Sequence, residues 1–524
     1  MKRMQLVRPL RNCCKSSPMS HLPFAKKCRL KSKVANVKED RKLADGPLHE
    51  DDYDALFACL AEYTDRYKAN NKVHERVSWL SRIVRLKGQS SDPVRILLAV
   101  SGGADSLALM VLCHEWCQRA DIGIELFVAS VDHRLRPESG DECAYVAQLA
   151  QERGLSHRTL VWEGEKSHAN LQAEAREARY RLLTDYAEEM SCHCLVLAHH
   201  LNDQAETVVM RLLRGSGVSG LGAMHEVQRQ GRLTLLRPFL SVPKTRLVAS
   251  LLERKIEWAE DPSNNKKSYL RARVRAMMPV LAEEGCSPER LGATARRMQR
   301  ADAALSTVVD KFFQDEALEA PGHSLWVNLS SYCALAEEFR LRILRKALIY
   351  VAGPAYPPRE IKLLAMDEAL QSAYSRQYAQ KRTVGGCCFD MLWRGKDGFF
   401  IYREPGRNPL ESPLFLQKPV DWLGLCSVRL AGEVDFGDER PVLHALGQEG
   451  RLIYEMKAGF LKSGAWNDDN LPVPLIEALP SVWWRGEPCA VMHWSNERDK
   501  PAFRVEFEEN DTIFSSNTDL GRMI

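Results

Sequence analysis

The sequence predicts an α/β protein in which a doubly wound parallel sheet follows an N-terminal extension and leads into helical and mixed α+β regions. Two observations support this fold class. Between positions 93 and 260, short apolar runs typical of strands covered on both faces alternate with helical patterns of roughly 10–20 residues. In addition, polar residues directly follow three of these runs, and the carboxyl ends of parallel strands lie at one edge of a sheet.

The first predicted strand leads into a glycine-containing loop. Arg95–Val100 is mostly apolar, and the apolar residues after position 106 recur at helical spacing. Adjacent glycines let a backbone approach an anion, and the N–H groups of a first helical turn point at it. We therefore predict a phosphate-binding loop made of Ser101, Gly102, Gly103, Ala104, Asp105 and Ser106. The alternative is an ordinary Gly-Gly turn with an aspartate cap.

The alternation of strands and helices continues along the chain. Further strands are expected over Ile124–Val131, His157–Trp162, Cys194–Ala198 and Leu233–Arg237, and helices over Glu138–Arg153, Asn170–Met190, Asp203–Leu213 and Pro243–Lys255. Asp132 and His133 follow the second strand, and His199 and His200 follow the fourth. In doubly wound sheets ligands bind beyond the carboxyl ends of the strands, so these residues should lie near the phosphate-binding loop.

Two carboxylates open the helix after the fourth strand. Asp203, Glu206 and Thr207 stand at i, i+3 and i+4, which places them on one helix face. Such a pair can hold Mg²⁺, or bind an ammonium group and take its proton. The alternative is that they only cap the helix and place acidic charge in its first turn, but capping does not call for His199 and His200 just upstream.

A second polar face lies on the long helix before the fourth strand. Arg176, Arg179 and Tyr180 also stand at i, i+3 and i+4. An arginine there can clamp a phosphate or stack on a base, whereas ion pairs with Glu174 and Glu177 on a solvated face are an equally acceptable interpretation.

A basic region begins at residue 261. Arg271 and Arg275 share a helix face, and Lys266 and several further arginines extend the basic excess to residue 300. Such density favours a polyanionic partner, with a solvated basic helix pair as the alternative. Residues 336–351 and 356–380 are expected to be helical, and much of the chain after residue 383 to be strand-rich. Aromatic pairs such as Trp483 and Trp484 are interpreted as core.

Composition limits the class of protein. The chain has 524 residues, a net charge of +4 and 15 cysteines without a C-x-x-C pair, which argues against a disulfide framework or a structural metal site. No apolar run reaches the length of a membrane span. The first 38 residues carry eleven Lys/Arg and no acidic residue, so they are interpreted as a disordered basic arm, or alternatively as an organellar transit peptide.

The predicted division of the chain into regions is 1–45 (basic arm), 46–92 (helical lead-in), 93–260 (catalytic domain), 261–380 (helical basic region) and 381–524 (strand-rich domain).

Taken together, these motifs resemble those of the bacterial tRNA(Ile)-lysidine synthetases, a family of PP-loop ATP pyrophosphatases with a Rossmann-like fold. The resemblance rests on residues 101–106, 131–136, 172–180, 199–217 and 261–271, and it is dense over about 93–300. Two positions depart from the family pattern. Asn202 replaces an aspartate, and Ala272 replaces the asparagine that usually follows the family's arginine.

The resemblance implies an enzyme that uses ATP, Mg²⁺ and L-lysine to modify the wobble cytidine of a tRNA(Ile) with a CAU anticodon. It implies catalytic roles for Asp105, Asp203, Glu206, His199 and Arg176. ATP would be held by residues 101–106 with Asp132 and His133, Mg²⁺ by Asp105 and Asp203, and tRNA by Arg271, Arg275, Arg214 and Lys266. The expected location is the cytoplasm, and a homodimer is left open.

Three other functions fit the motifs less well. A tRNA thiolase of the same class usually needs a cysteine pair, often C-x-x-C, which is missing here. A glutamine-dependent amidotransferase needs a nucleophilic N-terminal cysteine or a glutaminase domain, and neither is evident. A non-enzymatic RNA-binding protein is disfavoured because Ser101, Asp105, Ser106, Asp203 and Glu206 are all intact.

Overall fold

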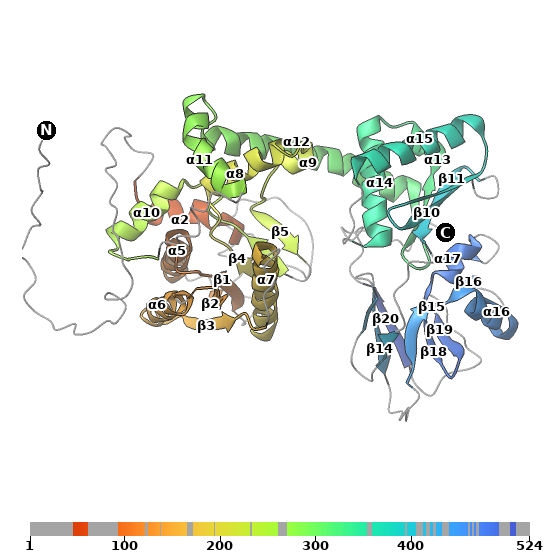
Figure 1. Cartoon of the computed structure of the whole chain (residues 1–524), viewed down its shortest axis with the longest axis horizontal. Coiled ribbons are helices and arrows are strands. Elements are labelled where there is room, and N and C mark those ends of the chain that lie inside the picture. Colours follow the sequence, from red (N-terminus) through yellow and green to blue (C-terminus); the bar gives the residue numbers. More distant parts are fainter. Residues whose placement is uncertain are drawn as a thin grey trace, which may run out of the picture. The chain divides into compact units, whose positions relative to one another are not determined.

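The computed structural model divides the chain into two compact units, residues 1–302 and 303–524 (Figure 1). The structure describes residues 46–60, 93–120, 124–136, 138–164, 171–192, 194–230, 233–259, 270–353, 359–392, 396–404, 412–414, 420–422, 426–431, 440–458, 462–463, 466–467, 471–491 and 504–509. The predicted basic arm and Lys266 lie outside these ranges.

The first unit is built on a six-stranded sheet with the strand order β3-β2-β1-β4-β6-β5. Its strands are β1 (Val94–Ala99), β2 (Ile124–Asp132), β3 (Ser156–Val161), β4 (Cys194–Val196), β5 (Val227–Gln230) and β6 (Leu233–Leu236). All pairings are parallel except that of β5 with β6. The chain therefore winds outward from β1 in both directions, which confirms the predicted doubly wound sheet.

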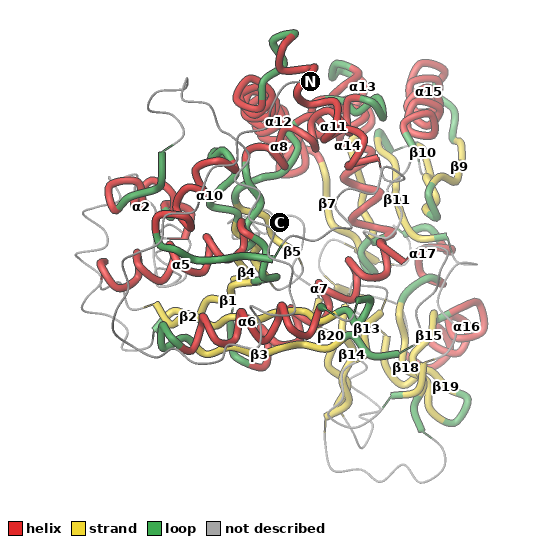
Figure 2. The backbone as a smooth tube through the Cα atoms, turned by 60° about the vertical axis from the view of Figure 1, so that its left-hand side comes forward, coloured by secondary structure: helices red, strands yellow, loops and turns green. Residues whose placement is uncertain are grey.

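Helices cover both faces of this sheet. They are α5 (Ala104–Ala120), α6 (Ser139–Gln151), α7 (Leu171–Glu189) and α10 (Lys244–Glu253). Alternate residues of β1 enter two cores: Ile96 and Leu98 pack with α5, α6 and α10, whereas Leu97 and Ala99 pack with α7. Figure 2 shows α6 running along β2 and β3. Because every β1 side chain except Arg95 is buried, the strand lacks polar alternation, as the sequence predicted.

Three further helices complete the site-bearing part of this unit: α8 (Leu201–Leu212), α9 (Val218–Leu221) and α11 (Leu270–Glu283). α11 packs on α8 (Figure 1). The long helix α12 (Pro288–Glu316) follows and runs across the division between the units. Close contact between α12 and α8 occurs at Gly292, where an added Cβ would lie 2.7 Å from Leu201 Cδ1.

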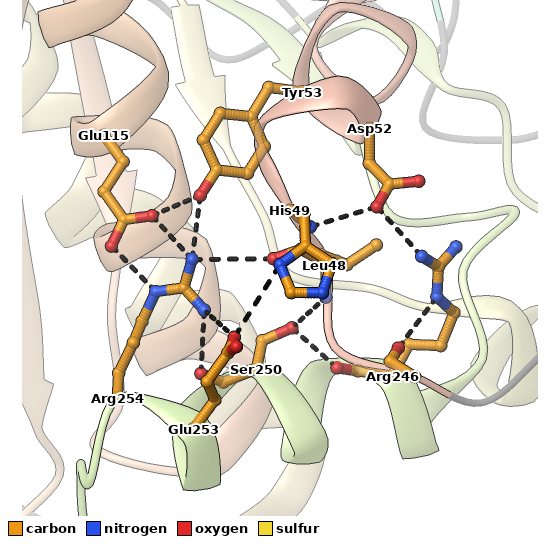
Figure 3. Close-up of polar contacts among 10 residues, drawn as sticks. Leu48, His49, Asp52, Tyr53, Glu115, Arg246, Ser250, Glu253 and Arg254 are labelled. Atoms are coloured by element: carbon orange, nitrogen blue, oxygen red, sulfur yellow. Dashed lines mark hydrogen bonds and ion pairs between the residues drawn. The ribbon is translucent and has the colours of Figure 1, made fainter.

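The segment before the sheet is anchored by a polar cluster. This segment contains the helix α2 (Glu50–Leu56), which packs on α5. Figure 3 shows the guanidinium of Arg254, just after α10, between Glu115 of α5 and Tyr53 of α2. Ser250 of α10 accepts a 2.7 Å hydrogen bond from the backbone N–H of Leu48. The cluster thus ties α2, α5 and α10 together.

The second unit is built from antiparallel sheets. Its five-stranded sheet has the order β7-β8-β11-β10-β9, formed by β7 (Ala317–Ala320), β8 (Ser324–Asn328), β9 (Gln380–Val384), β10 (Cys387–Met391) and β11 (Gly398–Arg403). One face packs against α13 (Leu329–Cys333), α14 (Glu337–Ala352) and α15 (Glu360–Arg376). Arg340 points inward and binds the buried carboxylate of Asp367 at 2.8 and 2.9 Å.

The remaining elements of the second unit are short. They are β12 (Ser412–Pro413), β13 (Val420–Trp422), β14 (Cys426–Ala431), β15 (Val442–Ala445), α16 (Gly447–Ala458), β16 (Lys462–Ser463), β17 (Trp466–Asn467), α17 (Val473–Glu477), β18 (Pro480–Trp484), β19 (Glu487–Val491) and β20 (Arg504–Glu509). Phe399, Phe400, Tyr402 and Trp483 are buried, which confirms their interpretation as core. Trp484 is only partly buried, and Arg485 lies over its ring.

Several elements differ from those expected. β5 was not predicted, because its sequence VQRQ has a single apolar residue and forms an exposed edge. β7 and β8 lie inside the region expected to be helical, since the ALEA of β7 has a helical rather than a strand composition. The division between the units falls at residue 302, within the predicted region 261–380.

Candidate active site

The loop between β1 and α5 has the shape of an anion cradle. Gly102 has φ = +84°, a left-handed conformation that glycine adopts without the penalty of a Cβ. The Ser106 hydroxyl donates to the Gly103 carbonyl at 3.0 Å and accepts from the Ser101 backbone N–H at 3.1 Å. These bonds hold the loop closed over the start of α5, where the first backbone N–H groups have no partner within the helix.

Asp105 lies in the first turn of α5 and faces two cationic or proton-donating groups. Its Oδ2 lies 3.4 Å from His200 Nε2 and 3.3 Å from Lys244 Nζ, while its buried Oδ1 has no hydrogen-bond partner among the described residues. Burial by itself raises the pKa of Asp105, but the hydrogen bond with His200 and the charges of His200 and Lys244 outweigh it and lower the pKa overall. The carboxylate is therefore ionised at neutral pH.

His200 connects this loop to α8. It is the N-cap residue of the helix: its Nδ1 accepts from the Asp203 backbone N–H at 3.3 Å, and the Asp203 carboxylate accepts from the His200 backbone N–H at 3.1 Å. This reciprocal capping arrangement fixes Asp203 close to Asp105 through the shared imidazole. The predicted capping role of Asp203 and its position near the phosphate-binding loop thus occur together.

The two α8 carboxylates meet two arginines from α11. Arg271 donates to Asp203 Oδ1 at 2.8 Å and to Glu206 Oε2 at 2.7 Å, and Arg275 donates to Glu206 Oε1 at 2.6 Å. The Glu206 side chain is only 3% exposed. Burial raises the pKa of Asp203, but the charges of His200 and Arg271 lower it overall, and the bond to Glu206 raises the pKa of Arg275.

His199 lies beside the same group in a different environment. Its buried Nδ1 has no hydrogen-bond partner within the part of the chain that the structure describes, and burial lowers the pKa of His199 to about 3. The imidazole is therefore neutral at physiological pH. It can orient a neighbouring group but carries no positive charge there.

Asp132 and His133 lie at the end of β2. Asp132 Oδ1 accepts from the Arg134 backbone N–H at 2.9 Å, and Arg134 has φ = +48°. Burial raises the pKa of Asp132, whereas bonds from Ser139 and Arg134 lower it overall. The His133 ring stands edge-on to Trp162, with ring centres 5.9 Å apart. Asp132 is the last residue of β2, and His133 follows it. Because β2 pairs with β1, both residues lie at the carboxyl end of the strand next to β1, as the sequence predicted.

Two side chains of the polar face of α7, Arg176 and Tyr180, contact each other. The Arg176 guanidinium lies over the Tyr180 ring at 5.0 Å and donates to its hydroxyl at 3.4 Å. Arg237, at the end of β6, is buried and donates to the His225 carbonyl at 2.9 Å. Burial lowers the pKa of both Arg179 and Arg237.

The predicted RNA-binding residues are found in three different situations. Arg214 is exposed after α8, while Arg211 holds the glycine-rich turn by donating to the Gly220 carbonyl at 2.7 Å. Arg271 and Arg275 face the acidic residues of α8, and Lys266 lies outside the described residues.

Asp105 and Asp203 differ in how well they suit Mg²⁺. Asp105 offers a buried oxygen beside the loop that no described residue binds, and one carboxylate with phosphate oxygens and water is a usual magnesium environment. Asp203 differs, because both its oxygens already interact with Arg271 or His200. In the part of the chain that the structure describes, no group of three or more His, Cys, Asp or Glu side chains is arranged to hold a metal.

Sequence reasoning missed three participants. The sequence indicates His200 only as a neighbour of His199, Lys244 only as part of a helix, and Arg237 only as the end of a strand. The cap position of His200 could have been found from the following Leu-Asn-Asp pattern, since an N-cap precedes its N3 carboxylate by three residues. Lys244 and Arg237 carry no comparable local signal.

Comparison with known proteins agrees with this geometry. A family model described as a PP-loop domain matches residues 76–281. A tRNA(Ile)-lysidine synthase of Rhodopseudomonas palustris is 44% identical over 310 residues, covering 58% of this chain and 88% of that protein. The Bradyrhizobium sp. enzyme of the same name is 45% identical and covers 62% of this chain and 94% of its own length. This chain belongs to the tRNA(Ile)-lysidine synthase family.

The family likeness extends beyond the first unit in some relatives. The tRNA(Ile)-lysidine synthase of Ruegeria pomeroyi is 35% identical over 400 residues, covering 76% of this chain and 88% of its own length. Among solved structures, a U34-tRNA thiolase from Methanococcus maripaludis with its [4Fe-4S] cluster is 16% identical, with a TM-score of 0.35, covering 47% of this chain and 80% of its own. A likeness this distant does not favour the thiolase alternative.

The two departures from the lysidine synthase pattern lie at the edge of the site. Asn202 Oδ1 accepts from the Lys244 backbone N–H at 3.1 Å, so it links α8 to the start of α10. Ala272 stands between the arginines of α11 and is partly exposed.

Over the described ranges, none of the helices combines the length and apolarity needed to span a membrane.

Proposed function

We propose that this chain ligates L-lysine to C2 of the wobble cytidine in a CAU-anticodon tRNA(Ile), with ATP cleaved to AMP and pyrophosphate. The product, lysidine, pairs with adenosine instead of guanosine. The observation that carries the proposal is the position of His200, whose imidazole lies beside both Asp105 of the loop and the Asp203 carboxylate, to which we assign the binding of lysine. Family membership supplies the substrate class.

In the first step, O2 of the cytidine attacks the α-phosphorus of ATP. The new O2–phosphorus bond forms as the bond to the bridging oxygen breaks, and pyrophosphate leaves with that electron pair. Residues 101–106 would hold the phosphates through backbone N–H groups and serine hydroxyls. Asp105 would bind Mg²⁺, which neutralises phosphate charge and polarises the phosphoryl oxygens.

In the second step, the ε-amine of lysine attacks C2, and AMP leaves with the former O2. The amine must first lose a proton. Asp203 and Glu206 would attract the ammonium form, because both carboxylates already bind a cationic arginine side chain in this structure. Arg271 and Arg275 hold these carboxylates, and their place at the site suits them to the phosphates of an entering anticodon loop once those ion pairs rearrange.

The polar faces around this centre receive supporting roles. Neutral His199 would orient the base or the amine, and Asp132 with His133 would contact the adenosine. Arg176, already stacked on Tyr180, has the geometry to hold AMP or a flipped base. Arg214 and Lys266 remain predicted RNA contacts. The predicted location stays cytoplasmic, with an organelle as the alternative, and we propose no oligomeric state.

The test is direct incorporation of labelled lysine. Purified protein is incubated with ATP, Mg²⁺, radiolabelled lysine and an unmodified CAU-anticodon tRNA(Ile) transcript, with Asp105→Ala as the control variant. Label that becomes attached to the RNA, survives mild base and is lost in the variant supports lysidine synthesis. Release of AMP and pyrophosphate without label would retain the adenylating loop and overturn the lysine assignment.

A further inference from the structure

Lys244 contributes an ammonium group to the PP-loop without being part of the loop sequence. It is the first residue of α10, and its Nζ lies 3.3 Å from Asp105 Oδ2. The Lys244 side chain is 48% exposed, so it reaches the loop from the solvent side. Asp105 thus lies between a buried imidazole and a half-exposed ammonium group.

The backbone of Lys244 is fixed on both sides. Its N–H donates to Asn202 Oδ1 at 3.1 Å, which joins it to the helix that carries Asp203. Further along α10, Arg246 binds Asp52 at 2.9 Å and Ser250 binds the backbone of Leu48 (Figure 3). Because the main chain is held in this way, only the flexible four-carbon stem of Lys244 can adjust when a ligand arrives.

The ion pair itself is weakly held. An ammonium that remains half exposed gains little from one carboxylate, because water screens the attraction and competes for the donors. A polyphosphate bound at residues 101–106 would present several anionic oxygens beside Asp105. The ammonium would then have a stronger partner within reach, and Asp105 Oδ2 would be released for other interactions.

We propose that Lys244 is a further ATP-binding residue, whose ammonium exchanges Asp105 for the phosphates that leave as pyrophosphate. The inference rests on the proposed use of ATP at this loop. In the absence of ATP, Lys244 neutralises the Asp105 carboxylate; with ATP bound, it neutralises the leaving group. The contact is electrostatic and involves no proton transfer, so an arginine at position 244 can replace it.

Equilibrium binding tests this role without turnover. The probe is the α,β-methylene analogue of ATP, which cannot release pyrophosphate, titrated calorimetrically into the full-length protein at saturating Mg²⁺. AMP, which lacks the phosphates assigned to Lys244, is titrated in parallel. The variants are Lys244→Gln and Lys244→Arg, with Lys255→Gln as the matched control, since Lys255 lies just beyond the opposite end of α10 and loses the same charge.

We expect Lys244→Gln to weaken binding of the analogue by about tenfold or more, and Lys244→Arg and Lys255→Gln by about threefold at most. AMP affinity should change by less than about twofold in every variant. The proposal is overturned if Lys244→Gln binds the analogue like the wild type, or if AMP binding weakens equally, which would indicate a structural role in shaping the loop. Lysine incorporation by the wild type separately tests the proposed function.

Discussion

Glu206 is a buried carboxylate at the centre of the site, and its two oxygens are bound to Arg271 and Arg275. We expect Glu206→Gln to reduce lysine transfer by about 100-fold or more, because the amide keeps the shape but neither attracts the ammonium nor accepts its proton. Pyrophosphate release from ATP should fall by less than about tenfold, since the loop lies on another element. Labelled lysine and labelled pyrophosphate measure the two steps separately.

Glu125→Gln is the matched control for this prediction. Glu125 also binds an arginine, Arg95, but this exposed ion pair lies at the start of β1 and β2, away from their carboxyl ends. Both steps should remain close to wild type in this variant. If Glu206→Gln slows both steps equally, Glu206 is not specific to the lysine step, and its role is to shape the whole site.

His199 gives the site a predicted dependence on pH. Its pKa is about 3 in the folded protein, because of burial, and 6.5 ordinarily, so between these values the unfolded chain binds more protons. The free energy of unfolding therefore keeps its full value, as far as His199 is concerned, above pH 6.5. It decreases as the pH falls from 6.5 towards 3. The maximum slope is about 1.4 kcal/mol per pH unit.

We expect His199→Asn to remove this slope, since asparagine does not titrate. Thermal unfolding of both proteins at pH 7.5, 6.5 and 5.5 measures the effect, with the wild-type midpoint falling more steeply below pH 6.5 than that of the variant. If the unfolding midpoint falls equally with pH in the two proteins, the pKa of His199 is not lowered by folding, and the prediction is wrong.

At the scale of elements, the cluster at Arg254 links three helices that are distant in sequence. Its guanidinium binds Glu115, Tyr53 and the Leu48 backbone (Figure 3). We expect Arg254→Met to destabilise the first unit by about 1–3 kcal/mol, because partly buried carbonyl and carboxylate groups lose a charged donor. Arg95→Met is the control: its ion pair with Glu125 is about 43% exposed, and its loss should cost about 0.5 kcal/mol or less.

Denaturant unfolding of the two variants checks this prediction. A similar loss of stability in both would mean that the Arg254 cluster is no more than a solvated surface network. Loss of ATP-analogue affinity in Arg254→Met, with Arg95→Met unchanged, would further show that the position of α10 matters to the loop that Lys244 contacts.

The elements that were predicted correctly share a local signal. β1 and the loop after it could be identified because a strand buried on both faces is apolar at nearly every position and the glycines follow at once. Exposed edge strands such as β5 have no such pattern. The ion pair between Arg271 and Glu206 could not be predicted from the sequence either, because the two residues are 65 positions apart. A basic helix indicates an anionic partner but does not identify it.

At the scale of the whole molecule, charge is distributed unevenly. The net charge is only +4, yet the first 38 residues alone contribute eleven cationic side chains and no acidic ones. Removal of residues 2–38 therefore reverses the sign of the net charge. A polyanion such as tRNA should respond to that change mainly through non-specific phosphate contacts.

We expect a chain lacking residues 2–38 to bind tRNA more weakly at low salt, with a slope of log Kd against log salt concentration reduced by about two or more. Each phosphate contact contributes about 0.7–0.9 to this slope, so the change reports how many contacts the segment makes. The rate of lysine incorporation at saturating tRNA should stay within about twofold of wild type, because the candidate catalytic residues all lie after residue 100. Fluorescence anisotropy with labelled tRNA at several salt concentrations measures the slope. An unchanged slope would show that the segment does not contact tRNA and would favour its interpretation as a targeting sequence.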